Sequence, residues 1–270
     1  MEEEQIQLKF FAEFIEKEIG IIYPEENYYQ LKKRLGEISE VLGFHEVDKL
    51  WNTVQQGVTE EVRRVILEIA TNNETSFFRD SRLFSILGKY IIPELLSRQG
   101  SGSLKIWSAA CSTGQEPYSV AIILRDLQKI PFTILATDIC ETVLEKAKRG
   151  EYTQLEVQRG MPASTLIKHF EKCSDDLWRV NSYLKEGIRF EACNLIRPWR
   201  AHGMFEIIFC RNVLIYQNIE RKKEIITRIA EHIVPGGFLI LGSAENISSL
   251  SNLFEQKFYD GALVYVRLNR

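Results

Sequence analysis

Apolar residues recur at helical spacing through the first 72 residues of the chain. Ile6, Phe10 and Phe14 follow this spacing, and no alternating strand pattern interrupts the region. Further helical patterns open at Pro24 and cover about 47–56 and 58–71. The pattern therefore predicts a small all-helical N-terminal domain over residues 1–72.

From Leu104 the pattern changes to short apolar runs separated by helical periods. These runs cover residues 104–107, 132–136, 188–190, 205–209 and 238–241. Strands that alternate with helices are typical of an α/β fold, with a mostly parallel sheet covered on both faces. Two last runs, 254–258 and 262–266, flank Asp260-Gly261 and predict a hairpin at the edge of the sheet.

The remaining stretches divide the chain into segments. Residues 73–103 form a connecting segment, and its end at 99–103 is rich in glycine and serine, which predicts a flexible linker. A second domain covers 104–270. Within it the pattern loosens over about 150–187, which is too long for a simple loop and predicts a small inserted subdomain.

Composition and charge narrow the class of protein. Hydrophobic residues make up 45% of the 270 residues and charged residues 26%, the balance of a globular protein. The net charge of −3 argues against a nucleic-acid partner. The start is acidic and no apolar run approaches a membrane span, so we expect neither export nor membrane insertion. The five cysteines lack a CxxC pair, which favours reduced thiols, a cytoplasmic protein and no bound metal.

Polar and small residues follow the first predicted strand. Residues 108–117 combine small side chains with the start of a helix, where free backbone N–H groups can bind a cofactor. This stretch is not a GxGxxG motif, so the turn alone is weak evidence for nucleotide binding. A helix capping box formed by Thr113 and Glu116 explains the same residues equally well.

Two other predicted strands end in polar residues at the same edge. Asp138 ends the second strand, where an acidic side chain can accept both ribose hydroxyls, although it could instead cap the helix that begins near Glu141. Arg211 and Asn212 follow a buried strand, although Arg211 could be a surface ion-pair partner. Carboxyl ends of parallel strands share one edge, so these residues point to one site.

A polar cluster with two aromatic residues precedes the sheet at residues 72–80. From the residues alone, the simplest interpretation is a helix N-cap, a core pair of Phe77 and Phe78, and a solvated Arg79.

Taken together, five segments resemble the chemotaxis receptor methyltransferase (CheR) family. They are Asn73–Arg79, Ser108–Ser119, Ala136–Ile139, Phe209–Tyr216 and Gly236–Asn246. Their order matches the family, and the resemblance covers essentially the whole chain. It implies a class I methyltransferase-like, doubly wound sheet with an antiparallel last strand. It also implies S-adenosylmethionine-dependent methylation of glutamate side chains on the cytoplasmic helices of chemoreceptors, with S-adenosylhomocysteine as the other product.

The resemblance also assigns site residues. The family's cofactor contacts fall on Asn73, Thr75, Arg79, Glu116, Asp138, Asn194, Leu195, Arg211 and Asn212. Of these, Asp138 is expected to hold the ribose, Asn194-Leu195 the adenine, and Glu116 with Arg79 the methionine end. Tyr216 matches the family's active-site tyrosine, so Tyr216 and Arg79 are the expected catalytic residues.

Two departures from the family pattern concern the substrate. Ile91-Ile92 stand where members carry an arginine thought to lie near the substrate. Residues 171–176 are fewer than in members that grip the tail peptide of a receptor, so we expect this enzyme to recognise the methylation helices directly. We also expect a monomer.

Two alternatives remain open. One is a methyltransferase with another substrate, although the signature of DNA amino-methylating enzymes, Asn/Asp-Pro-Pro-Tyr/Phe, is missing. The other is a non-catalytic module that binds S-adenosylmethionine as a scaffold in a signalling complex.

Overall fold

The computed structural model describes residues 2–99, 102–128, 131–199 and 203–269, and we analyse it as the structure of the protein. The chain divides into two compact units, one formed by 1–72 with 216–221 and one by 73–215 with 222–270. Two residues of the predicted linker, 100 and 101, lie outside the described residues, so that linker stays a prediction.

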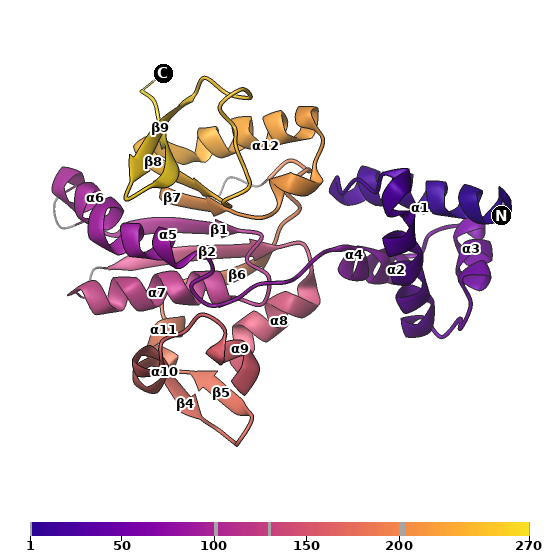
Figure 1. Ribbon diagram of the computed structural model, residues 1–270, viewed down its shortest axis with the longest axis horizontal. Coiled ribbons are helices and arrows are strands. Elements are labelled where there is room, and N and C mark those ends of the chain that lie inside the picture. The colour runs from indigo at the N-terminus through magenta and orange to yellow at the C-terminus, as the bar shows by residue number, and fades with distance from the viewer. Residues whose placement is uncertain (1, 100–101, 129–130, 200–202, 270) are drawn as a thin grey trace. The chain divides into compact units, whose positions relative to one another are not determined.

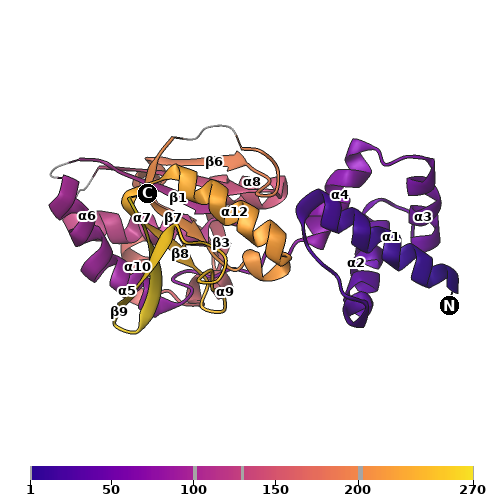
Figure 2. The same cartoon turned by 90° about the horizontal axis from the view of Figure 1, so that it is seen from above.

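The first unit is a group of helices that can be followed in Figure 2. Its elements are α1 (Glu2–Ile19), the 3-10 turn η1 (Glu25–Asn27), α2 (Tyr28–Val41), α3 (Val47–Gln56) and α4 (Glu60–Ala70). Phe11 and Ile15 are fully buried, whereas Ile6 is 57% exposed, so the buried face of α1 is rotated away from Ile6. Thr59 is the N-cap of α4, since its side chain accepts a hydrogen bond from the N–H of Val62.

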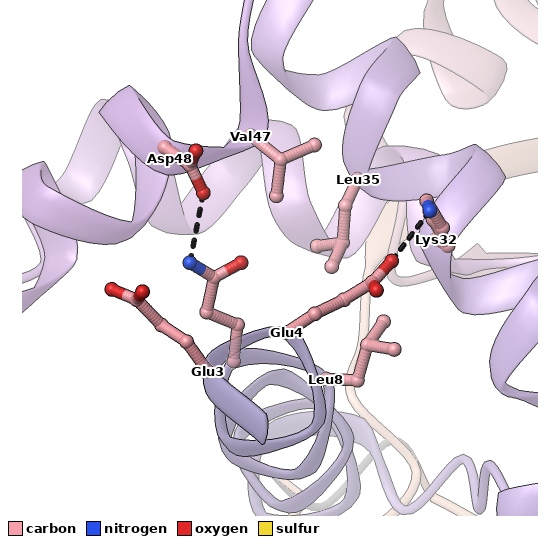
Figure 3. Close-up of a pocket in the computed structure, with 8 residues that line it drawn as sticks. Glu3, Glu4, Leu8, Lys32, Leu35, Val47 and Asp48 are labelled. Atoms are coloured by element: carbon pink, nitrogen blue, oxygen red, sulfur yellow. Dashed lines mark hydrogen bonds and ion pairs between the residues drawn. The ribbon is translucent and has the colours of Figure 1, made fainter. Parts of the chain in front are cut away.

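A pocket of about 330 Å³ lies among the helices of this unit and is lined by residues of α1, α2 and α3 (Figure 3). Lys32 forms an ion pair with Glu4 across 2.5 Å, and Gln7 Nε2 donates to Asp48 Oδ1 across 2.9 Å. These contacts tie α1 to α2 and α3.

The second unit contains a sheet that has seven strands within the described residues, in the order β6-β2-β1-β7-β8-β10-β9. The strands are β1 (Leu104–Ala109), β2 (Phe132–Asp138), β6 (Ile188–Ala192), β7 (Phe205–Cys210), β8 (Ile233–Leu241), β9 (Phe254–Tyr259) and β10 (Ala262–Arg267). The pairs from β6 to β8 are parallel, whereas β10 is antiparallel to both β8 and β9. The predicted fold class and terminal hairpin are confirmed.

Helices cover both faces of this sheet (Figure 1). They are α5 (Ser81–Ile86), the π turn η2 (Leu87–Ile91), α6 (Ile92–Gln99), α7 (Gln115–Gln128), α8 (Glu141–Arg149) and α12 (Ile219–His232). Alternate side chains of β1 enter different cores: Ile106 packs with residues of α5 to α7, and Trp107 packs with residues of α12. Every position of β7 is buried, and its residues are apolar except Glu206.

The segment between α8 and β6 forms its own small sheet, next to α7 in Figure 1. Its elements are β3 (Glu151–Thr153), α9 (Gln154–Gln158), α10 (Ala163–His169), β4 (Phe170–Lys172), β5 (Leu177–Val180) and α11 (Ser182–Lys185). The strand order is β3-β5-β4, and both pairs are antiparallel. A short 3-10 turn, η3 (Leu214–Tyr216), follows β7.

Candidate functional site

The turn between β1 and α7 has an unusual backbone. Its φ angles are positive at Ala110 (63°), Ser112 (49°) and Gly114 (91°). A Cβ at Gly114 would lie 2.8 Å from the Cβ of Ala147, so the turn packs too closely there for any side chain. This tight turn brings the first turn of α7, with its positive dipole end, to the carboxyl edge of the sheet.

Asp138 lies at that edge, at the end of β2, and is 6% exposed. Its Oδ2 accepts a hydrogen bond from the N–H of Ser112 across 2.7 Å, and its Oδ1 accepts one from the N–H of Cys140 across 3.0 Å. Burial raises the pKa of Asp138 above its ordinary value, and these N–H groups oppose that shift. The N-cap of α8 is Cys140, so Asp138 joins two turns rather than capping the helix.

Arg211 lies between two carboxylates. Its Nη1 donates to Glu116 Oε2 across 2.9 Å, and its Nη2 donates to Asp80 Oδ2 and, across 2.8 Å, to the carbonyl of Arg79. Ser108 Oγ donates to Glu116 Oε1 across 2.6 Å. The side chains of Arg211 and Glu116 are only 3% and 11% exposed, so the surface ion pair considered for Arg211 is wrong.

The capping box considered for Thr113 and Glu116 is also not what the described residues form. Glu116 is engaged by Ser108 and Arg211, while the hydroxyl of Thr113 donates to Gln115 Oε1 across 2.7 Å. Glu116 therefore joins the end of β1 to the end of β7.

The segment before α5 is anchored to the same edge. Ser112 Oγ donates to the carbonyl of Asn73 across 2.7 Å, and the N–H of Phe78 donates to Ser119 Oγ across 3.0 Å. Arg79 is half-buried, and its Nη1 donates to the carbonyl of Glu74 across 3.0 Å. Thr75 lies between these anchors and is half-buried.

Phe77 anchors this segment to the inserted subdomain. It is fully buried and packs edge-on against Tyr152 and Phe170, with ring centroids 4.9 and 5.4 Å apart. The expected core position of Phe77 is therefore found, and Phe78 packs at the margin of the same core.

The loop after β6 runs beside Asp138. Cys193 N–H donates to the carbonyl of Asp138 across 2.9 Å, which places Asn194 and Leu195 directly after that contact. Asn194 Oδ1 accepts a hydrogen bond from the N–H of Ile196 across 3.1 Å, and Leu195 is 8% exposed. Glu116, Asp138, Asn194 and Arg211 are thus all carried by the carboxyl edge of one sheet.

Three residues of this edge received no role from the sequence. Asp80 bonds Arg211, Ser108 bonds Glu116, and Glu245 binds the backbone after β7. Asp80 directly follows a motif residue, and the other two lie inside quoted motifs, so the motifs located them. The contacts of Asp80 and Glu245 join residues far apart in the sequence, which periodicity cannot reveal.

Comparison with known families shows to which family the chain belongs. Residues 73–262 match the family described as CheR methyltransferase, SAM binding domain, where SAM is S-adenosylmethionine. The chain belongs to the CheR methyltransferase family. This confirms the resemblance drawn from the five motifs.

Relatives of this CheR-family chain match it over nearly its whole length. Chemotaxis protein methyltransferase Cher2 of Pseudomonas putida is 33% identical over 262 residues, covering 94% of this chain and 95% of the relative. A chemotaxis protein methyltransferase of Vibrio parahaemolyticus is 34% identical over 261 residues, covering 94% of each. Among solved structures, the N-methyltransferase NodS of Bradyrhizobium japonicum has a TM-score of 0.42 and 15% identity, covering 75% of this chain and 95% of NodS.

Tyr216 belongs to the first unit of this CheR-family chain, together with the rest of 216–221. Its hydroxyl accepts a hydrogen bond from Asn72 Nδ2 across 3.0 Å, and its carbonyl accepts one from the N–H of Ile22 across 3.1 Å. The catalytic role expected for Tyr216 stays a prediction.

Two features are absent from the described ranges. No cluster of three or more His, Cys, Asp or Glu side chains there is arranged to hold a metal ion. Within the same ranges, no helix combines the length and the apolar composition that crossing a membrane requires.

Proposed function

We propose that this protein transfers the methyl group of S-adenosylmethionine to glutamate side chains of chemoreceptors, forming glutamyl methyl esters. The observation that carries the proposal is the buried set of charged side chains at one sheet edge, Glu116, Arg211 and Asp138, in a chain of this family. The near full-length similarity to chemotaxis protein methyltransferases supports chemoreceptors as the substrate and the cytoplasm as the location.

The residues at the edge fit S-adenosylmethionine. The cofactor offers hydroxyl and ammonium donors, and the carboxylates of Asp138 and Glu116 are acceptors of matching chemistry. Arg211 Nε is buried and has no hydrogen-bond partner in the described part of the chain, which is costly unless a ligand or water accepts from it. The tight turn at Gly114 packs against Ala147 and so holds the start of α7 at this edge.

Within this proposal, Asp138 holds the ribose hydroxyls, Asn194 and Leu195 the adenine, and Glu116 with Arg79 the methionine end. The full set of cofactor contacts that we propose is Asn73, Thr75, Arg79, Glu116, Asp138, Asn194, Leu195, Arg211 and Asn212. The catalytic role of Tyr216 is proposed from its place in the motif Phe209–Tyr216 alone.

The reaction needs little general acid or base catalysis from the protein. When bound, S-adenosylmethionine supplies an electrophilic methyl group. A glutamate side chain, with an ordinary pKa of about 4.3, is already ionised at neutral pH and can attack without losing a proton. The new bond joins a carboxylate oxygen to the methyl carbon, while the electron pair of the broken bond stays on sulfur. The protein's residues therefore act by positioning the reactants and excluding water.

A labelling experiment tests the proposal. The full chain, S-adenosylmethionine with a radioactive methyl group, and receptor-enriched membranes should give labelled receptor that releases radioactive methanol in base. The variant Glu206→Gln changes a buried carboxylate at the other end of β7, away from the proposed site. It should still label the receptor. Cofactor binding without any transfer would instead support the scaffold alternative.

A further inference from the structure

Glu245 makes an extensive set of contacts that the proposed function does not yet use. It lies after β8 and is 7% exposed. Its carboxylate accepts hydrogen bonds from the backbone N–H of Gly242 and of residues 212–215, across 2.7 to 3.2 Å. One buried side chain therefore holds the backbone that follows β7.

The two carboxylate oxygens of Glu245 accept hydrogen bonds from different N–H groups. Oε2 accepts from Asn212 and Gly242, each across 2.8 Å, and so joins the ends of β7 and β8. Oε1 accepts from Leu214 across 2.7 Å and from its neighbours in the sequence on both sides, which are the N–H groups at the start of η3. A carboxylate at such a cluster of N–H groups forms charge-assisted bonds.

The backbone held in this way is strained and tightly packed. Asn212 has a φ of 58°, a conformation that a non-glycine residue adopts at a cost. A Cβ at Gly242 would lie 2.8 Å from Asn212 Nδ2 and 2.9 Å from Glu245 Oε2, so a larger residue there would displace these side chains. The hydrogen bonds of Glu245 are the contacts that fix Asn212 in this conformation.

We propose that Glu245 is a positioning residue for the cofactor. It fixes the turn that carries Arg211 and Asn212 before any ligand binds, so that binding does not have to order that turn. The inference rests on the proposed function, because it takes the edge formed by Arg211 and Asn212 as a cofactor site. Glu245→Gln would replace one acceptor oxygen with an NH₂ group, which cannot accept from the N–H groups that face it.

The test compares two buried carboxylates in the full chain. Glu245→Gln should bind S-adenosylhomocysteine about tenfold more weakly by calorimetry, since it leaves buried N–H groups unpaired. Glu206→Gln is the control, because Glu206 is 7% exposed and accepts from the N–H of Lys105 across 2.6 Å at the opposite end of β7. Its affinity should be unchanged. Equal affinity of both variants at matched thermal stability would overturn the proposal.

Two further measurements cover a Glu245→Gln chain that does not fold. Glu245→Asp keeps the charge but is shorter, so it should fold and bind with intermediate affinity. In the natural chain without cofactor, the amides of residues 212–215 should exchange slowly with deuterium. Rapid exchange of these amides, or full affinity in Glu245→Asp, would contradict the proposal. Failure of the natural chain to bind S-adenosylhomocysteine would instead refute the proposed function.

Discussion

Arg211, at the end of β7, donates to Glu116, in the first turn of α7, across 2.9 Å, and both side chains are nearly buried. Since Glu116 also accepts from Ser108 in β1, this contact joins the ends of β1 and β7, two neighbouring strands in the middle of the sheet. Asp80 pairs with the same guanidinium, so a third segment, the one before α5, is tied to them. At the carboxyl edge of the sheet, these three segments are thus joined by charges that the protein itself neutralises in part.

Removing one carboxylate of this cluster should destabilise the fold. Glu116→Gln weakens the pairing of a buried guanidinium, and because Asp80 remains, we expect a loss of about 1–3 kcal/mol in the free energy of unfolding. Urea denaturation measures it. In a double-mutant cycle with Asp80→Asn, the two losses should not be additive, since both residues contact Arg211. Strict additivity would contradict a shared cluster.

Asp138 should give cofactor binding a dependence on pH. Burial raises its pKa above the ordinary 3.8, and only the ionised carboxylate accepts freely from both ribose hydroxyls. The affinity for S-adenosylhomocysteine should therefore fall as the pH drops through this raised pKa. Calorimetry across a pH series should show that Asp138→Asn binds more weakly at neutral pH and lacks this acidic fall.

Truncation of the same residue gives the size of its contribution. Asp138→Ala removes up to two hydrogen bonds to the ribose, each worth about 0.5–1.5 kcal/mol, so the affinity should fall at least severalfold. Unchanged binding to a folded Asp138→Ala chain would remove Asp138 from the site. The persistence of the acidic fall in Asp138→Asn would assign that fall to another group.

Three consecutive basic residues of α2, Lys32, Lys33 and Arg34, differ in their contacts. Lys32 pairs with Glu4, as Figure 3 shows, and Arg34 Nη1 donates to the carbonyls of Ile69 and Thr71 at the end of α4. Lys33 is exposed. Because Lys32 and Arg34 are bound within the first unit and Lys33 is exposed, we expect Lys33 to steer the substrate and Arg34 to stabilise the helices.

Charge reversal at Lys33 should slow methylation of receptors at low salt and leave cofactor affinity unchanged, because steering acts on the rate of encounter. Arg34→Ala is the matched comparison and should lower the free energy of unfolding by about 1–3 kcal/mol. Initial rates over a salt series and urea denaturation separate the two effects. An unaltered rate for Lys33→Glu at low salt would mean that this face of α2 is only solvated.

The inserted subdomain is the basis for our prediction that the enzyme does not grip the tail peptide of a receptor. Its β4 and β5 are joined by Cys173–Asp176, where the N–H groups of Cys173 and Ser174 both donate to the carbonyl of Leu177, across 2.8 and 3.2 Å. A connection this short leaves little chain to close over a peptide on the edge strand. We expect equal methylation rates for a receptor with and without its last few residues. Micromolar binding of the free tail peptide would contradict this.

The sequence predicted β1, β2 and β7 because each contains a mostly buried run of apolar residues with clear boundaries. Residues 205–209 became β7 with one residue added. By contrast, β8 begins at Ile233 rather than 238, because Pro235 and two glycines mask a strand whose pairing with β7 is irregular at its start. Strands of three residues, such as β3 and β4, are too short to show any periodicity.

Some residues of the candidate site could likewise be predicted from the sequence, and others could not. Asp138 and Arg211 could be predicted because they end apolar runs that share one sheet edge. The contacts of Glu245 and Asp80 could not, since they depend on side chains meeting backbone or charges more than 25 residues away. Resemblance supplied Thr75 and Tyr216, for which the residues alone gave no chemical signal.

Mass spectrometry of a purified receptor cytoplasmic fragment after incubation with the full chain and S-adenosylmethionine tests the central claim most directly. The account predicts a mass gain of one methylene per site, located on glutamate side chains and lost on treatment with base. Modification of lysine or asparagine, or an unmodified receptor in the presence of bound cofactor, would contradict it.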